Sequence, residues 1–256
     1  MSIIGVIHLP PLPGAPGHAT SMSTIVDAAR QDAITLSEAG FDAIIIENFG
    51  DAPFFADNVP PATVAAMTRV IADLADATDL DLGVNVLRND GLAALAVAAA
   101  TNANFVRINV LSGSMYTDQG LITGRAAEVV RLRDQICPDV VICADVMVKH
   151  ATPPAGLTLS DAASDLIERS GADAIIVSGS GTAKPTALND VKTVAKLAGE
   201  MPVMVGSGVT NRTIASMLEV AEAVIVGTAT KVDGVTTNAV DPKRARALVK
   251  AAKKES

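Results

Sequence analysis

The feature that most constrains the fold is a regular alternation of short apolar runs with alanine-rich stretches of helical length. The apolar runs are almost wholly hydrophobic, as expected for strands that are buried on both faces of a parallel sheet. We predict eight such strands: Ile3–Ile7, Asp42–Ile46, Asp81–Val86, Phe105–Asn109, Val140–Asp145, Ala174–Ser178, Val203–Val205 and Val224–Val226.

A segment with helical composition follows each predicted strand, and several of these segments carry end signals. Gly40 and Gly171 stand where a left-handed helix cap is needed, and Asp241-Pro242 places proline at a first helical position. The predicted helices are Thr24–Ala39, Pro61–Ala77, Asp90–Ala100, Gly124–Gln135, Ser160–Ser170, Ala187–Ala198, Arg212–Val220 and Pro242–Lys253.

One strand–helix unit is used repeatedly along the chain. The segments Glu38–Ile45 and Arg169–Ile176 are near-repeats, and each joins the end of a helix to the start of a strand. Eight units without a linker, in 256 residues, predict an α/β protein made of one (β/α)8 TIM barrel, with residues 1–256 as a single domain. A doubly wound open sheet is the alternative, but the GxGxxG turn that favours it is missing from Gly5–Pro10.

Composition narrows the cellular setting and the partners. No apolar run approaches the roughly 20 residues that a spanning helix needs, and no basic leader precedes the first strand, so we expect a cytoplasmic protein without a membrane partner. Cys137 and Cys143 do not form a CxxC pair and are expected to be buried thiols. The net charge of −8 argues against a nucleic-acid partner.

Two consecutive glycine-containing turns follow the last two predicted strands. Glycine lets the backbone approach a ligand closely, and a helix start offers unpaired N–H groups. After the last two strands of a barrel, such turns form the usual phosphate site. We predict phosphate binding by Gly179, Gly206, Ser207, Gly208, Gly227 and Thr228. The alternative is that these glycines serve only the turns.

Polar side chains stand at the carboxyl ends of the other predicted strands, where a barrel carries its active site. Burying so many polar groups without partners would cost a few kcal/mol each, so we expect a ligand pocket. We assign catalysis to Glu47, Arg107, Asp145, Lys149 and His150. We assign substrate binding to His8, Asn48, Asn85, Arg88, Asn109 and Ser178.

The charged residues in this set leave alternatives open. Glu47 and Asp145 could divide acid and base roles, because paired carboxylates can have their pKa values driven apart. Arg107 is either paired with one of them or awaits an anion. We expect Lys149 to act electrostatically, with Schiff-base chemistry as the alternative.

We predict no metal and no cofactor apart from phosphate, which serves as a co-substrate or as a group of the substrate. No HExxH motif and no closely spaced histidine pair is present. A Mg²⁺ ion held by Asp51 or Asp145 together with a phosphate stays open as an alternative.

Two long loops suggest further contacts. The segment 48–57 contains three phenylalanines, which form either a pocket wall or packing against a helix or subunit. The segment 111–120 carries the only tyrosine and could reach a neighbouring subunit. We expect a homo-oligomer.

Several ordered phrases resemble the BtpA/SgcQ family over essentially the whole chain. They are Gly5–Gly14, Ile46–Asp51, Gly83–Arg88, Arg107–Leu111, Thr117–Gly120, Ala144–His150 and Val205–Thr210. The resemblance implies a barrel of the ribulose-phosphate-binding kind. It fixes the fold and the site better than the reaction, because the family takes its name from photosystem I biogenesis in cyanobacteria and also occurs without photosynthesis.

Three functions follow as hypotheses from these features. The first is phosphate-dependent cleavage of the N-glycosidic bond of a nucleoside, with phosphate held by the glycine turns. The second is a phosphosugar isomerase, aldolase or lyase that uses a carboxylate or Lys149 as its base. The third is a non-enzymatic photosystem I assembly factor, which has no use for a phosphate site or a charged barrel mouth.

Overall fold

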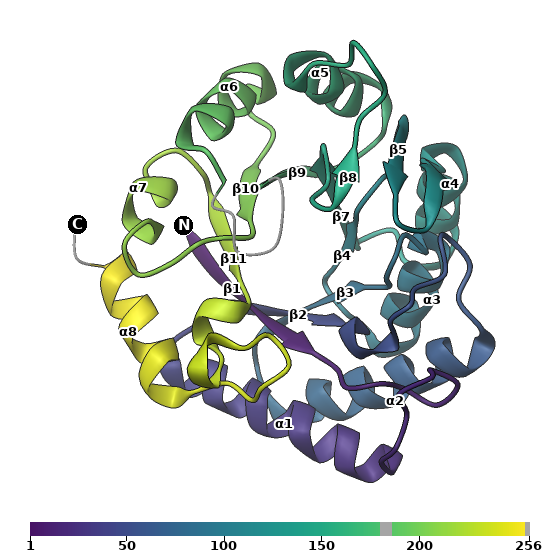
Figure 1. Ribbon diagram of the computed structural model, residues 1–256, viewed down its shortest axis with the longest axis vertical. Helices are drawn as coiled ribbons and strands as arrows, with labels where there is room; N and C mark the ends of the chain where they lie inside the picture. The colour runs from purple at the N-terminus through teal and green to yellow at the C-terminus, as the bar shows by residue number, and fades with distance from the viewer. Residues whose placement is uncertain (180–185, 254–256) are drawn as a thin grey trace.

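Eight parallel strands close into a barrel in the computed structural model, which describes residues 1–179 and 186–253 (Figure 1). The order around the barrel is β1-β11-β10-β9-β7-β4-β3-β2, so the first and last strands of the chain are neighbours. The strands are β1 (Ser2–His8), β2 (Ala43–Glu47), β3 (Asp81–Asn85), β4 (Phe105–Ile108), β7 (Val141–Val146), β9 (Ala174–Ser178), β10 (Val203–Gly206) and β11 (Ala223–Val226). The predicted TIM barrel is confirmed.

The helices form a ring outside the barrel (Figure 1). They are α1 (Met22–Ala39), α2 (Pro61–Ala77), α3 (Gly91–Thr101), α4 (Ala126–Ile136), α5 (Leu159–Arg169), α6 (Leu188–Ala198), α7 (Ile214–Leu218) and α8 (Pro242–Ala252). Side-chain caps begin four of them, through Ser21, Asp90, Thr158 and Asp241. Such caps satisfy N–H groups that have no partner inside the helix.

One predicted helix is much shorter than expected. The segment Arg212–Val220 contains only the five-residue helix α7, and the residues before it form a turn in which the Thr213 hydroxyl accepts a hydrogen bond from the Thr210 N–H. The turn after β10 therefore does not lead directly into a helix. Three residues of 3₁₀ helix, Thr228–Thr230, follow β11, and α8 begins only at Pro242.

The core has an outer and an inner part. A large cluster fills the layer between the strands and the helices, and includes Leu36, Met67 and Leu74. A smaller cluster fills the inside of the barrel, where Ile45, Phe105 and Ile176 are buried. Cys137 and Cys143 are buried free thiols, as predicted.

A small antiparallel sheet extends the barrel beside α4 and α5. It consists of β5 (Ser114–Thr117), β6 (Gly120–Thr123) and the short β8 (Ala151–Thr152), in the order β6-β5-β8. Met115 and Ile122 face each other across the hairpin and pack with Val110 and Val148. The segment expected to be an insertion loop is therefore a hairpin with a small core of its own.

A buried ion pair ties the last loop of the barrel to the first helix. The Lys231 ammonium donates to Asp32 Oδ2 at 2.8 Å, and Lys231 is only 1% exposed. Asp32 Oδ1 accepts from the backbone N–H of Val240 at 2.7 Å, so one carboxylate holds both ends of the loop. The loop between β11 and α8 thereby has a fixed position at the barrel mouth.

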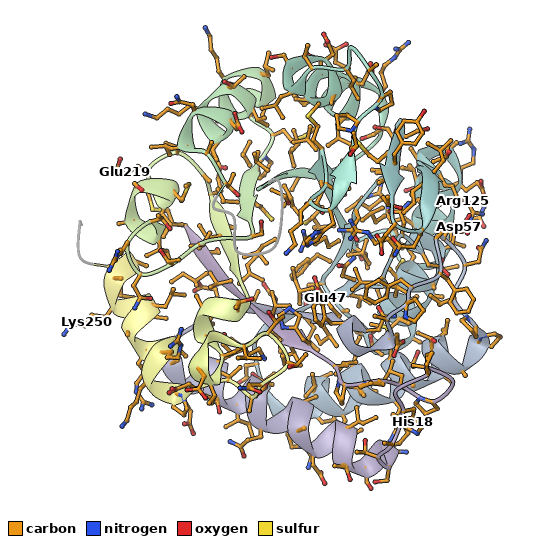
Figure 2. The ribbon with its side chains drawn as sticks, in the orientation of Figure 1. His18, Glu47, Asp57, Arg125, Glu219 and Lys250 are labelled. Carbon is orange, nitrogen blue, oxygen red and sulfur yellow. The ribbon has the colours of Figure 1, made fainter. Side chains whose placement is uncertain are left out.

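Lys231→Met should reduce the free energy of unfolding by about 3–5 kcal/mol, because it leaves the Asp32 carboxylate buried without its cation. Urea denaturation of the variant measures this loss. Lys250→Met is the matched control, since Lys250 lies on the outside of α8 (Figure 2). A change in Lys231→Met no larger than in Lys250→Met would contradict a structural role for the pair.

Candidate active site

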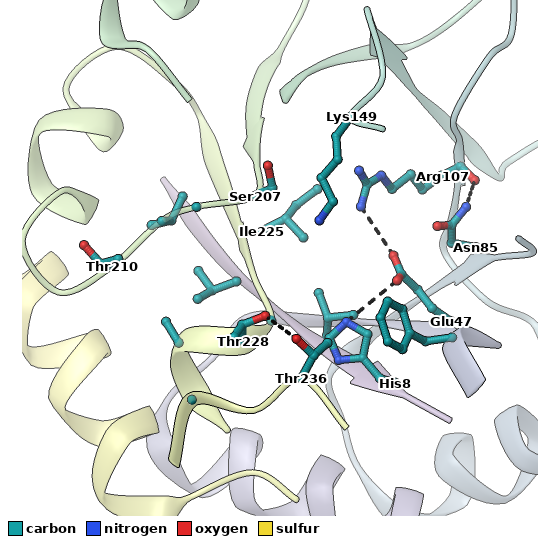
Figure 3. A pocket seen from close by; sticks show the side chains of 18 of the residues that line it. His8, Glu47, Asn85, Arg107, Lys149, Ser207, Thr210, Ile225, Thr228 and Thr236 are labelled. Carbon is teal, nitrogen blue, oxygen red and sulfur yellow. Dashed lines mark hydrogen bonds and ion pairs between the residues drawn. The ribbon is translucent and has the colours of Figure 1, made fainter. Parts of the chain in front are cut away.

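A large cavity opens at the carboxyl ends of the strands, with a volume of about 1250 Å³ (Figure 3). Strand register brings its polar residues to one rim, because His8 pairs with Glu47 and Glu47 pairs with Asn85. The glycine turns after β10 and β11 form one wall, and residues after β2, β3, β4 and β7 form the other. The cavity thus brings together members of both sets of residues that the sequence indicated.

Arg107 is the centre of a buried charge network. Its Nε and Nη2 donate to the two oxygens of Asp145 at 2.9 and 3.0 Å, and its Nη1 donates to Glu47 Oε1 at 3.3 Å. Burial alone would lower the pKa of Arg107, but the charge and hydrogen bonds of Asp145, and then Glu47, raise it overall. Arg107 is therefore paired with both carboxylates.

Asp145 lies behind Arg107 and has a side chain that is 0% exposed. Asn109 Nδ2 donates to its Oδ2 at 3.2 Å, and the Ser178 hydroxyl donates to its Oδ1. Asp145 and Ser178 do not line the cavity, whereas Asn109 does. This arrangement suits Asp145 to positioning Arg107 and places it away from direct contact with a ligand.

Glu47 faces the cavity with its other carboxylate oxygen. Oε2 lies 3.8 Å from His8 Nε2, and the two side chains are almost fully buried. Burial raises the pKa of Glu47, although Arg107 and Lys149 act in the opposite direction. A carboxyl group with a raised pKa can hold a proton and give it to a bound ligand.

His8 stays uncharged at neutral pH. Burial lowers its pKa to about 3, with Lys231, Lys149 and Arg107 adding to the effect. The ring makes an edge contact with Phe49 at 4.9 Å between centroids. Within the described residues, Nδ1 is buried without a hydrogen-bond partner. His8 therefore suits hydrogen bonding to a ligand better than carrying a charge.

The two asparagines predicted to bind substrate lie in different places. Asn85 lines the cavity and donates to the Arg107 carbonyl at 2.9 Å, while its Oδ1 is buried without a partner in the described chain. Asn48 does not line the cavity. It accepts from the Leu87 N–H at 2.7 Å and donates to Asp51 Oδ2 at 3.1 Å, so it holds two loops together.

Asp51, one candidate for a metal ligand, is used in the same loop. Its Oδ1 accepts from the Leu12 N–H at 2.8 Å, and burial raises its pKa. Among residues 1–179 and 186–253, no group of three His, Cys, Asp or Glu side chains is placed to hold a metal ion. None of the described helices is long and apolar enough to cross a membrane.

Arg88, Lys149 and His150 contribute to the cavity from the loops after β3 and β7. Arg88 Nη2 donates to the Lys149 carbonyl at 2.6 Å, which ties the two loops together. Burial lowers the pKa of each of the three side chains. Figure 3 shows Lys149 reaching toward the middle of the cavity from the wall opposite Thr228.

Four of the six residues predicted to bind phosphate, Ser207, Gly208, Gly227 and Thr228, line the cavity in two turns. These turns, residues 207–212 and 227–229, are called the cradle below. Ser207 and Gly208 have φ values of +75° and +70°, which turn the backbone sharply at the cavity wall. The Thr228 hydroxyl lies 2.9 Å from that of Thr236, which joins this turn to the following loop. Gly179 is not a cavity residue; its N–H donates to Ser207 Oγ at 3.2 Å and supports the turn.

Gly206 and Gly227 have a steric reason to be glycine. A Cβ atom on Gly227 would lie 2.7 Å from His8 Cε1, and one on Gly206 would lie 2.6 Å from Ile176 Cγ2. Gly206 does not line the cavity, whereas Gly227 does. Because these two positions carry no Cβ atom, His8 and Ile176 can pack directly against the turns.

Several cavity residues were not predicted from the sequence. Phe49 and Phe54 of the segment 48–57 line the cavity, which agrees with the pocket-wall alternative for this loop, whereas Phe55 is 56% exposed. The others are polar residues in turns or in the first turn of α8, where no periodic pattern marks them: Asp118, Thr210, Asn211, Arg212, Thr236, Lys243 and Arg244. Thr210 and Asp118 lie in two of the phrases that resemble the family, Val205–Thr210 and Thr117–Gly120, and this was the available signal.

The fold and site define a (β/α)8-barrel protein with a cavity at the carboxyl ends of its strands, lined by charged as well as apolar side chains. Solved structures share this fold at low identity. N-(5′-phosphoribosyl)anthranilate isomerase from Pyrococcus furiosus has a TM-score of 0.59 at 12% identity, over 99% of both chains. Tryptophan synthase from M. tuberculosis has a TM-score of 0.59 at 19% identity, over 98% of this chain and 91% of that one.

The chain belongs to the BtpA family, whose model matches residues 1–254. The photosystem I biogenesis protein BtpA of Synechocystis sp. is 43% identical over 97% of this chain and 87% of that protein. An uncharacterized protein of Thermococcus kodakarensis is 45% identical over 98% of this chain and 95% of that protein. The family resemblance of the sequence is confirmed.

His8→Gln should make the fold less sensitive to acid. The pKa of His8 is about 3 in the folded protein and about 6.5 in the unfolded chain, so below pH 6.5 the unfolded state binds more protons. Stability is therefore lost as the pH falls from 6.5 toward 3, by up to about 1.4 kcal/mol per pH unit. Urea denaturation of both proteins across this window measures the difference in slope. Equal slopes of stability against pH in the two proteins would mean that folding does not lower the pKa of His8.

Proposed function

We propose that the protein cleaves the N-glycosidic bond of a nucleoside with phosphate, releasing the base and a sugar 1-phosphate. One observation carries the proposal. The cradle shares a single cavity with Glu47, a buried carboxyl group whose pKa is raised by burial. Phosphorolysis needs this pair of features, because an anion must attack the sugar while the departing base receives a proton.

The chemistry assigns a role to each wall of the cavity. A phosphate oxygen forms a bond to the anomeric carbon as the bond from that carbon to the base breaks. The sugar passes through an oxocarbenium-like state, which the negative charge of phosphate stabilises. The electron pair of the broken bond goes to the base nitrogen, which takes the proton from Glu47.

The charge network keeps Glu47 ready for this role. Arg107 binds only Oε1 of Glu47, so Oε2 remains on the side of His8 and the cavity. Asp145 balances the charge of Arg107 through two hydrogen bonds. His8 Nδ1 and Asn85 Oδ1, which are without partners in the described chain, are suited to hold sugar hydroxyls or the polar edge of the base.

The direct test is incubation of the protein with a panel of nucleosides, with and without inorganic phosphate, followed by chromatography of the free base. We expect release of base only when phosphate is present. Release without phosphate would identify a hydrolase, and no release from any nucleoside, with or without a 5′-phosphate, would end this proposal.

Glu47→Gln should reduce kcat at least 100-fold, since the amide has no proton of suitable acidity to give to the leaving base. Asp145→Asn should also reduce activity, because Arg107 would lose its charge partner. Glu219→Gln is the control, since Glu219 is exposed on the outside of the barrel (Figure 2). Thermal unfolding checks that the variants fold, and full activity in both Glu47→Gln and Asp145→Asn would disprove this site.

Gly208→Asp should weaken phosphate binding at least tenfold, because it places a negative charge in the cradle. Gly199→Asp is the control, because Gly199 also has a positive φ, +62°, and open space around a Cβ atom. Calorimetric titration with inorganic phosphate compares the two variants. Equal affinities would place the phosphate elsewhere.

A phosphosugar isomerase, aldolase or lyase is the second candidate, and Lys149 favours it. Its ammonium reaches into the cavity, and burial lowers its pKa. Within the described chain, the ammonium has no hydrogen-bond or ion-pair partner. Such an amine can act as a base or attack a carbonyl group. Borohydride trapping of a phosphosugar on wild type but not on Lys149→Met would favour this candidate over phosphorolysis.

A role in photosystem I biogenesis is the third candidate, because a relative that is 43% identical carries that name. The charged cavity counts against it, since a factor that assembles a complex works through its outer surface and does not need a concave site of this kind. Function depends on the site and not on the barrel alone.

A further inference from the structure

The cavity has the opposite charge to the chain as a whole. The protein has a net charge of −8, yet six basic side chains and only two carboxylates line the cavity in the described part of the chain. The carboxylates are Glu47 and Asp118, and the basic residues are Arg88, Arg107, Lys149, Arg212, Lys243 and Arg244. A concentration of positive charge in an acidic protein indicates an anionic ligand.

The basic residues fall into two groups once Arg107 is set aside as the partner of Glu47 and Asp145. The outer group consists of Arg212, which is part of the cradle, and of Lys243 and Arg244 from α8. Arg244 Nε donates to the Ala229 carbonyl at 3.1 Å, which fixes it against the turn after β11. This group lies on the β10–β11–α8 side of the barrel (Figure 1).

The inner group consists of Lys149 and Arg88, on the β3–β7 side. The Arg88 guanidinium donates to the Lys149 carbonyl at 2.6 Å and thereby holds the lysine backbone in place. The Lys149 ammonium itself points into the cavity from the wall facing Thr228 and Thr236 (Figure 3). Two cationic subsites thus face each other across one cavity.

Uncharged polar atoms on the β1 and β3 wall lack partners. Asn85 Oδ1 and His8 Nδ1 are the buried side-chain atoms of the cavity that have no hydrogen bond within the described chain. Asn85 is 1% exposed, so leaving its acceptor unpaired is costly unless a ligand supplies a donor. The hydroxyl groups of a sugar are such donors.

We infer that the cavity binds two phosphate groups at once, with a sugar between them, and that the sugar brings one of the two. The volume of about 1250 Å³ exceeds the 300–1,000 Å³ range of many small-molecule pockets and leaves room for both. Together with the proposed function, on which this step rests, the inference names the substrate class as nucleoside 5′-monophosphates.

The reaction then balances as follows. An oxygen of inorganic phosphate bonds to C1′ of the nucleotide while the bond from C1′ to the base nitrogen breaks. That nitrogen receives the electron pair and the proton held by Glu47, which regains a proton from the phosphate through solvent. The products are the free base and ribose 1,5-bisphosphate, so a reaction that consumes a doubly phosphorylated pentose must follow.

Binding of two simple probes tests the two subsites without turnover. We expect the protein saturated with inorganic phosphate to bind ribose 5-phosphate in calorimetry with its affinity changed less than threefold. Lys149→Met and Arg212→Met should each weaken the binding of one probe at least tenfold, and the two variants should affect different probes. The exposed Lys250→Met should change the affinity for neither probe. Displacement of one probe by the other, or loss of the same probe in both variants, would overturn the inference.

Turnover tests the substrate class. We expect kcat/KM for a nucleoside 5′-monophosphate to exceed that for its nucleoside at least 100-fold, with phosphate present. A nucleoside that is cleaved as fast as its 5′-monophosphate would overturn the substrate class and leave the proposed function intact. If neither the nucleoside nor its 5′-monophosphate is cleaved, but inorganic phosphate and ribose 5-phosphate bind together, the proposed function would end and the two phosphate subsites would be retained.

Discussion

The guanidinium group of Arg107 is the interaction on which the barrel mouth depends. A buried cation is tolerated only when its charge and its N–H groups are satisfied, and here the side chains of Asp145 and Glu47 do so together. Asp145 takes two of the hydrogen bonds and Glu47 takes one. The network therefore joins β2, β4 and β7, while Ser178 extends it to β9 through its hydrogen bond to Asp145.

The charge network contacts the turn after β11 through His8. His8 lies between Glu47 and Gly227, because its ring approaches the carboxylate on one side and the turn after β11 on the other. A side chain at position 227 would collide with that ring. The Lys231–Asp32 pair joins the end of the same turn to α1, and Lys231 also contributes to the low pKa of His8.

The fold followed from the sequence because strands buried on both faces give continuous apolar runs that periodicity can recognise. The placement of Glu47, Arg107 and Asn85 followed as well, since polar residues at the ends of such strands share one rim. Asn48 was expected at the cavity but does not line it. Glu47 is the last residue of β2, and the Asn48 side chain that follows accepts a hydrogen bond from the Leu87 N–H in the neighbouring loop.

Other features required the three-dimensional structure. The Lys231–Asp32 pair joins residues separated by 199 positions, and no local pattern connects them. The residues of the cradle were predicted to lie at two helix starts, but α7 is only five residues long and α8 begins well after Thr228. Tight turns, held by Thr213, Ser207 and Thr236, take the place of those helix ends.

The most direct test of this account is a crystal structure of the protein with inorganic phosphate, because phosphorolysis and the two-phosphate inference both require an anion beside the turns after β10 and β11. The account predicts a phosphate inside the cavity, within hydrogen-bonding distance of the backbone N–H groups of Gly208 and Thr228. A phosphate bound only outside the cavity, or an empty cradle at saturating phosphate, would contradict it.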